Sequence, residues 1–196
     1  SLRRRQRQMC IRDRYTGDGI ASLSLTDRAT ICNMGAELGA TTSIFPTDER
    51  TKEYLIQQGR EEDYIEMKAD EDATYDQELT VDLSTLVPMT AKPHSPDAVV
   101  PVQELEGMKI NQVEIGSCTN SSFADMMKAA KILKGHKVAD HVSLVIAPGS
   151  SSILAMLSKN GALADMIQAG ARILECGCGP CIGMGQAPVS YTHLTL

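Results

Sequence analysis

Three cysteines near the C-terminus lie in the glycine-rich stretch Cys176-Gly177-Cys178-Gly179-Pro180-Cys181. Cys178 and Cys181 form a C-x-x-C pair, a spacing at which two thiolates can bind one metal ion or form a redox pair. The glycine and proline between them favour a tight turn. Because a usual iron–sulfur cluster has four thiolate ligands, a cluster here needs a further cysteine from elsewhere in the chain, and Cys118 is the candidate.

The spacing alone leaves other uses of the C-x-x-C pair open. A structural zinc half-site, a redox pair and two buried thiols all fit it. The tetrapeptide from Cys178 to Cys181 is also the redox sequence of thioredoxin, in which more of the sheet must follow. Only 15 residues follow Cys181 and the chain has no tryptophan, so a thioredoxin domain cannot be completed.

The composition is that of a folded globular protein. The 196 residues are 42% hydrophobic, which is enough for one large or two modest domains. No apolar run approaches the roughly 20 residues that a membrane helix needs. Six cysteines without a secretory signal indicate a reducing compartment, so we expect a cytoplasmic protein without disulfides.

The charge is uneven along the chain. Residues 1–14 carry six arginines and one acidic residue, whereas the remainder carries 13 basic and 24 acidic residues, a net charge of −11. The remainder is therefore a poor candidate for binding nucleic acid. Residues 1–14 and 189–196 resemble peptides translated from sequencing adapters, so we expect a disordered, non-native leader and a non-native tail.

The first half of the chain predicts an α/β unit over residues 15–87. Helices are expected over 25–38 and 47–59 and strands over 40–45 and 79–83, with acidic, solvated chain over 60–78. Asn33 and Glu37 are four residues apart in the first helix, so their side chains project from one side of it. Both a solvated helix edge and a binding site fit this pair.

The second half predicts another α/β unit, over residues 102–188. Half of the eight prolines lie in residues 88–101, which indicates an extended linker and the domain boundary. Strands are expected over 112–115, 142–147 and 171–174, alternating with helices that begin after 121–122, after 150 and near 163. In a parallel sheet with right-handed crossovers, the turns after the strands lie at the same edge. Cys118, the turn at Ser150 and the C-x-x-C pair are therefore expected there.

Three thiolates at one sheet edge could hold a 4Fe-4S cluster by three of its irons and leave the fourth iron open as a Lewis acid. Cys176 is a possible fourth ligand, but only one residue separates it from Cys178, and we expect it to pack behind the turn. The N-termini of the helices that follow Cys118 and Ser150 would favour an anionic cluster and a carboxylate substrate.

Three segments resemble signature segments of the aconitase family, in the family's order. They are residues 30–37 (TICNMGAE), 115–122 (IGSCTNSS) and 178–183 (CGPCIG), and the likeness extends over about residues 17–188. The resemblance implies an α/β fold of two three-layer α/β/α units with mainly parallel sheets, similar to the second and third domains of that family. It also implies that a 4Fe-4S cluster is bound by three cysteines: Cys118, Cys178 and Cys181.

The same resemblance implies an activity. Asn33 and Glu37 would reach the active site, with Glu37 near the hydroxyl or water on the open iron. The implied reaction is the isomerisation of citrate to isocitrate through cis-aconitate, a step of the tricarboxylic acid cycle with a small tricarboxylate substrate. The Cys-Gly-Pro-Cys form favours aconitate hydratase; the alternative is a related hydro-lyase, homoaconitase or the large subunit of 3-isopropylmalate dehydratase.

Parts of the family have no match in this chain. Family members have an N-terminal domain with Asp and His residues facing the substrate, an arginine-bearing stretch after the C-x-x-C pair, and a mobile domain that supplies a serine base. We therefore expect an internal fragment that is inactive alone and whose partners are the missing N-terminal and C-terminal domains, with no membrane. A structural metal-binding module with a closed site, and an RNA-binding role that would need a basic cleft, are the other candidate classes.

Overall fold

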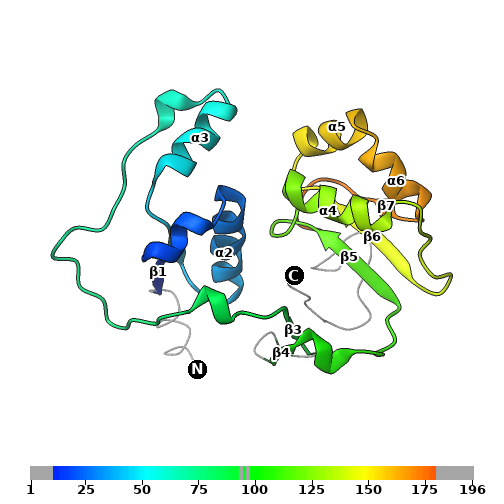
Figure 1. The fold of residues 1–196 in the computed structure, drawn as a ribbon, viewed down its shortest axis with the longest axis horizontal. Coiled ribbons are helices and arrows are strands. Elements are labelled where there is room, and N and C mark those ends of the chain that lie inside the picture. The colour runs from blue at the N-terminus through cyan, green and yellow to red at the C-terminus, as the bar shows by residue number, and fades with distance from the viewer. Residues whose placement is uncertain (1–10, 93–94, 96–97, 180–196) are drawn as a thin grey trace. The chain divides into compact units, whose positions relative to one another are not determined.

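The structure is a computed structural model that describes residues 11–92, 95 and 98–179 (Figure 1). Contacts within the chain divide it into two compact units, Ser1–Leu86 and Val87–Leu196. Within the described ranges, no helix has both the length and the apolar character needed to cross a membrane.

The second unit is built on a parallel three-stranded sheet in the order β5-β6-β7. Its elements in chain order are β5 (Gln112–Gly116), α4 (Phe123–Leu133), β6 (Ser143–Ala147), α5 (Ser151–Lys159), α6 (Ala162–Gln168) and β7 (Arg172–Ile173). The strands predicted over 112–115, 142–147 and 171–174 are thus confirmed. The predicted fold class, α/β with mainly parallel sheets, is confirmed as well.

Successive side chains of β6 point to opposite faces of the sheet, and buried side chains pack on both faces. Leu144 and Ile146 pack with buried residues of all three helices, including Met126, Leu157 and Met166. The next residues along the strand, Val145 and Ala147, form a second cluster with Leu174. Figure 1 shows α4, α5 and α6 on one face of the sheet, as expected when successive crossovers have the same hand.

Residues 88–101 differ from the extended linker that the prolines predicted. β3 (Met89–Ala91) and β4 (Val99–Pro101) pair antiparallel, and the short 3-10 helix η4 (Val102–Leu105) follows. Pro101 can close this pair because it stands at the end of a strand, where its missing N–H costs no hydrogen bond inside the ladder. Pro88 therefore precedes the first strand of this antiparallel pair, and Pro101 ends the second.

The first unit has a two-stranded parallel sheet, β1 (Arg12–Arg14) and β2 (Thr42–Ile44), connected by α2 (Leu25–Glu37). α2 begins at a capping box between Ser24 and Asp27, and α3 (Glu49–Gln57) begins at another between Asp48 and Thr51. Gly35 lies against β2, where any Cβ would collide with the Ser43 hydroxyl. The remaining elements are three 3-10 helices, η1 (Asp18–Ser22), η2 (Glu61–Asp63) and η3 (Leu83–Thr85).

Two predictions for this unit are wrong. Residues 12–14, expected in a disordered leader, form β1, and Thr41 N–H donates to the Ile11 carbonyl at 2.7 Å. Backbone pairing of this kind does not depend on which side chains the strand carries. Residues 79–83 were expected to be a strand, but residues 79–82 are irregular, Leu83 begins η3, and Leu79 is 84% exposed. Alternation alone does not make a strand where no neighbouring strand is available for pairing.

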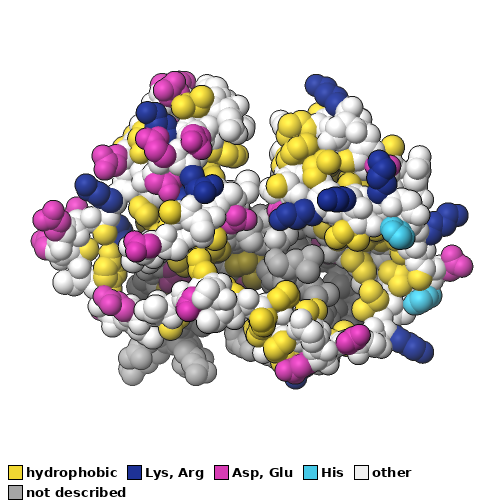
Figure 2. All heavy atoms as spheres, in the orientation of Figure 1, with side chains coloured by type: hydrophobic (Ala, Val, Ile, Leu, Met, Phe, Trp, Pro, Cys, Tyr) yellow, Lys and Arg dark blue, Asp and Glu magenta, His cyan; other side chains and the backbone are white. Residues whose placement is uncertain are grey.

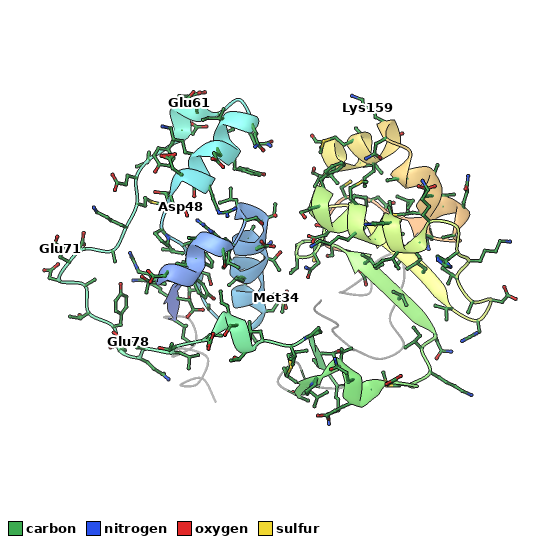
Figure 3. The ribbon with its side chains drawn as sticks, in the orientation of Figure 1. Met34, Asp48, Glu61, Glu71, Glu78 and Lys159 are labelled. Carbon is green, nitrogen blue, oxygen red and sulfur yellow. The ribbon has the colours of Figure 1, made fainter. Side chains whose placement is uncertain are left out.

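An ion pair between a buried arginine and a partly exposed aspartate joins α2 to the start of α3. The Arg28 side chain is only 2% exposed, and its Nη2 donates to Asp48 Oδ2 at 2.6 Å and to the Ile20 carbonyl at 3.0 Å. Asp48 lies where α3 begins, next to α2 (Figure 3). The hydrogen bond from Arg28, more than any other contact, holds the pKa of the Asp48 carboxyl below its usual value.

We expect Asp48→Asn to lower the free energy of unfolding by about 1–3 kcal/mol, because it leaves the buried guanidinium without its counter-charge. The depressed pKa of Asp48 means that this stabilisation is present above the unfolded-state pKa, near 4, and is lost as the pH falls through the lower folded-state pKa. Urea unfolding followed by circular dichroism at pH 7 and pH 3 should show the difference between wild type and variant shrinking at low pH.

The matched control is Asp63→Asn, which breaks the exposed pair between Arg60 and Asp63. Exposed pairs of this kind contribute about 0–1 kcal/mol, so the control should unfold almost as the parent does. Equal losses in the two variants would contradict a structural role for the pair between Arg28 and Asp48.

Candidate metal centre

Cys118 lies in the turn between β5 and α4. Gly116 ends β5 with a φ of 121°, and a Cβ there would collide with the carbonyl oxygen of Ala147. Ser117 follows in the left-handed region with a φ of 70°, and its N–H donates to that same carbonyl at 2.9 Å. The Cys118 thiol is exposed at the end of this turn, and its Sγ lies 3.6 Å from Thr119 Oγ1.

Cys178 lies beyond the end of β7 and also has an exposed thiol. Because β5, β6 and β7 are parallel, their carboxyl ends share one edge of the sheet, and the turn at Ser150 lies between the other two turns. The outer strands are two strand spacings apart, about 10 Å. Cys181, predicted as the third ligand, lies outside the described residues.

The thiols within the described ranges suit an anionic metal cluster in chemistry and exposure. Cys118 and Cys178 are exposed, whereas Cys176 is half-buried, as a residue packed behind the turn would be. No group of three His, Cys, Asp or Glu residues gathers in the part of the chain that the structure describes, a part that ends before Cys181.

Two helices begin at the same sheet edge. Ser122 is the N-cap of α4 and accepts a hydrogen bond from the Asp125 N–H, while Ser150 is the N-cap of α5 and accepts from the Ile153 N–H. The positive ends of the two helix dipoles lie beside the cysteine turns, where they favour negative charge. Ser121, the residue before the α4 cap, donates its hydroxyl proton to the Ser117 carbonyl.

Asn33 and Glu37 are both exposed on α2, in the first unit. At 100° per residue they project from the side opposite Arg28 and Gly35, the two residues that α2 buries. On the strand side, the half-buried Cys32 thiol donates to the Ser43 carbonyl at 3.4 Å, and burial raises its pKa. Asn33 and Glu37 therefore lie on the solvent-exposed face of α2.

The two units differ in charge. Residues 15–86 contain 16 acidic and 5 basic residues, whereas residues 87–196 contain 8 of each. Figure 2 shows acidic side chains over much of the visible face of the first unit and several basic ones over the second. The cysteine-bearing unit therefore has no net charge that would repel an anionic cluster or a carboxylate substrate.

Comparison with known proteins gives a match along most of the chain. The family model described as "Aconitase family (aconitate hydratase)" matches residues 14–107 and 102–194. Three similar proteins are 3-isopropylmalate dehydratase large subunit 2 of Archaeoglobus fulgidus (42% identical over 88% of this chain), large subunit 1 of Methanopyrus kandleri (44% over 86%) and the large subunit of Clostridium kluyveri (43% over 86%).

The matched region is only part of each relative. It covers 41% of the Archaeoglobus protein and 40% of each of the other two, so the chain spans about two fifths of the length of the curated relatives that it matches.

Proposed function

The chain belongs to the aconitase family, and we propose that the protein containing it is a hydro-lyase that acts on isopropylmalate. One observation carries the choice of substrate: the similar proteins, which match 86–88% of the chain, are named as large subunits of 3-isopropylmalate dehydratase. Such an enzyme removes water from a hydroxy-dicarboxylate and adds it back.

This proposal replaces the sequence-based preference for aconitate hydratase and for a place in the tricarboxylic acid cycle. That preference rested on the glycine and proline between Cys178 and Cys181. Residues between two metal ligands determine the shape of the turn, and we expect them to lie away from the substrate carbons that distinguish citrate from isopropylmalate. The names of the similar proteins favour the alternative that the sequence had left open.

We propose that Cys118, Cys178 and Cys181 hold a 4Fe-4S cluster, with Cys176 behind the turn. When bound, such a cluster supplies an iron without a thiolate, a Lewis acid for the substrate hydroxyl. The chain's own residues orient the reactants. The N-termini of α4 and α5 attract the carboxylates, Asn33 donates its amide hydrogens to substrate oxygen, and Glu37 gives a proton to the departing hydroxyl oxygen.

The partners of this chain follow from the same comparison. The name "large subunit" implies that each similar protein assembles with a small subunit, and we propose that the whole protein does the same. The base that removes the carbon-bound proton and most carboxylate contacts would come from the parts of the relatives that have no counterpart here. A chain with six cysteines, three of them proposed as cluster ligands, suits a reducing compartment such as the cytoplasm.

The test uses the chain alone and a chimera in which residues 15–188 replace the matching segment of the Archaeoglobus large subunit, supplied with that protein's small subunit. After anaerobic cluster reconstitution, we expect no turnover from the chain alone and turnover of 3-isopropylmalate by the chimera. Each is assayed with 3-isopropylmalate and with citrate. A chimera that prefers citrate would reverse the substrate assignment, and activity of the chain alone would mean that a residue between Tyr15 and Pro188 is the base.

A further inference from the structure

We propose that Ser121 and Gly149 are positioning residues for Cys118: they fix the backbone on both sides of this cysteine so that its thiolate faces the cluster. This inference rests on the proposed function, because it gives Cys118 the role of a ligand. It concerns a contact between two turns of the second unit, the β5–α4 turn and the β6–α5 turn.

Two hydrogen bonds join these turns, and a third lies within the first of them. Ser117 N–H donates to the Ala147 carbonyl at 2.9 Å, and Gly149 N–H donates to the Ser121 carbonyl at 3.2 Å. Within the first turn, the Ser121 hydroxyl donates to the carbonyl of Ser117. The backbone is thus held one residue before Cys118 and three residues after it.

Burial makes this arrangement hard to replace with water. Ser117 is 7% exposed and Ser121 is 5% exposed, while the thiol between them is exposed. Ser117 also has a φ of 70°, a region that residues other than glycine seldom adopt. Such a conformation persists where the surrounding contacts determine it, and it is often found at functional sites.

Gly149 is required by the close approach of the two turns. A Cβ at this position would lie 2.6 Å from Ser121 Oγ and 2.9 Å from the Ser121 carbonyl oxygen. Any side chain there would push Ser121 away and break the hydrogen bonds on both sides of it. The glycine therefore allows the contact that Ser121 makes.

Helix capping does not account for Ser121. The N-cap of α4 is its neighbour Ser122, whose hydroxyl accepts from the Asp125 N–H at 3.2 Å. Ser121 directs its hydroxyl away from the helix, to the residue before the cysteine. A ligand held by a fixed backbone loses less freedom when metal binds, which is the benefit of such supporting contacts.

The test compares Ser121→Ala with Ser122→Ala, two neighbouring serines that make different contacts. In the metal-free chain, amide hydrogen exchange should become about tenfold faster at Ser117 and Gly149 in Ser121→Ala. In Ser122→Ala the increase should appear at Asp125 instead, because that amide loses its capping acceptor. Unchanged exchange at Ser117 and Gly149 in Ser121→Ala would overturn the proposed contact.

A second measurement tests whether Ser121 and Gly149 help to retain the cluster. The chain is reconstituted anaerobically and incubated with a chelator, and cluster loss is followed by its visible absorption. We expect Ser121→Ala and Gly149→Ala to lose the cluster about tenfold faster than the parent, and Ser122→Ala, which removes only a helix cap, to lose it more slowly than either of them. Equal rates in the parent and Ser121→Ala, or equal acceleration by Ser121→Ala and Ser122→Ala, would overturn the positioning role.

The two readouts separate this inference from the proposed function. If the parent takes up no iron, the cluster proposal fails and the positioning role fails with it, whatever the exchange rates show. If the parent binds a cluster and Ser121→Ala retains it equally well, only the present inference fails.

Discussion

Replacing Glu37 by glutamine should lower turnover by about 10²-fold or more in the chimeric enzyme, while its cluster absorption stays unchanged. Glutamine keeps the size and the hydrogen-bonding shape of the side chain but cannot deliver a proton to a departing hydroxyl, and a positioned acid or base contributes on this scale. The exposed position of Glu37 on α2, opposite the face packed on the strands, leaves the carboxyl accessible to a substrate.

The matched control for this variant is Glu53→Gln. Glu53 is an exposed glutamate on α3 of the same unit, so its replacement makes the same chemical change away from α2. We expect this control to turn over 3-isopropylmalate at the parent's rate. If Glu37→Gln also does so with an intact cluster, Glu37 belongs to a solvated helix face and has no part in the chemistry.

Sequence reasoning located the helices and strands of the second unit to within a few residues. The reason is physical: β6 is an apolar run buried on both faces, and serine caps mark the starts of α4 and α5. It failed where structure depends on a pairing partner. β1 and the hairpin of β3 and β4 exist through backbone hydrogen bonds between segments, which side-chain patterns do not encode.

The candidate site was accessible from the sequence only in part. Cys118, Cys178 and Cys181 could be predicted as metal ligands from the sequence. The C-x-x-C spacing suits two ligands of one metal site, and the order of the strands places Cys118 at the same edge of the sheet. The contact of Ser121 with Gly149 could not be predicted from the sequence. The two residues are 28 positions apart, and only the structure shows that their turns touch. The positive φ of Ser117 is the structural signal that draws attention to it.

Serine substitution of any one of Cys118, Cys178 and Cys181 should abolish cluster assembly in the anaerobically reconstituted chain. Each would remove one of only three proposed thiolate ligands, and a serine hydroxyl is a far weaker ligand for iron in such clusters. Cys176→Ser is the matched control, because this half-buried cysteine lies two residues from Cys178 and is not a proposed ligand. We expect it to retain the brown charge-transfer absorption of the parent.

The central claim is that these thiolates hold an iron–sulfur cluster, and it is tested most directly by the iron, sulfide and zinc content of the chain after anaerobic reconstitution with both metals present. We predict about four irons and four sulfides per chain, with little zinc. One tetrahedral zinc per chain and no bound iron would contradict the account, because the cysteines would then form a structural zinc site.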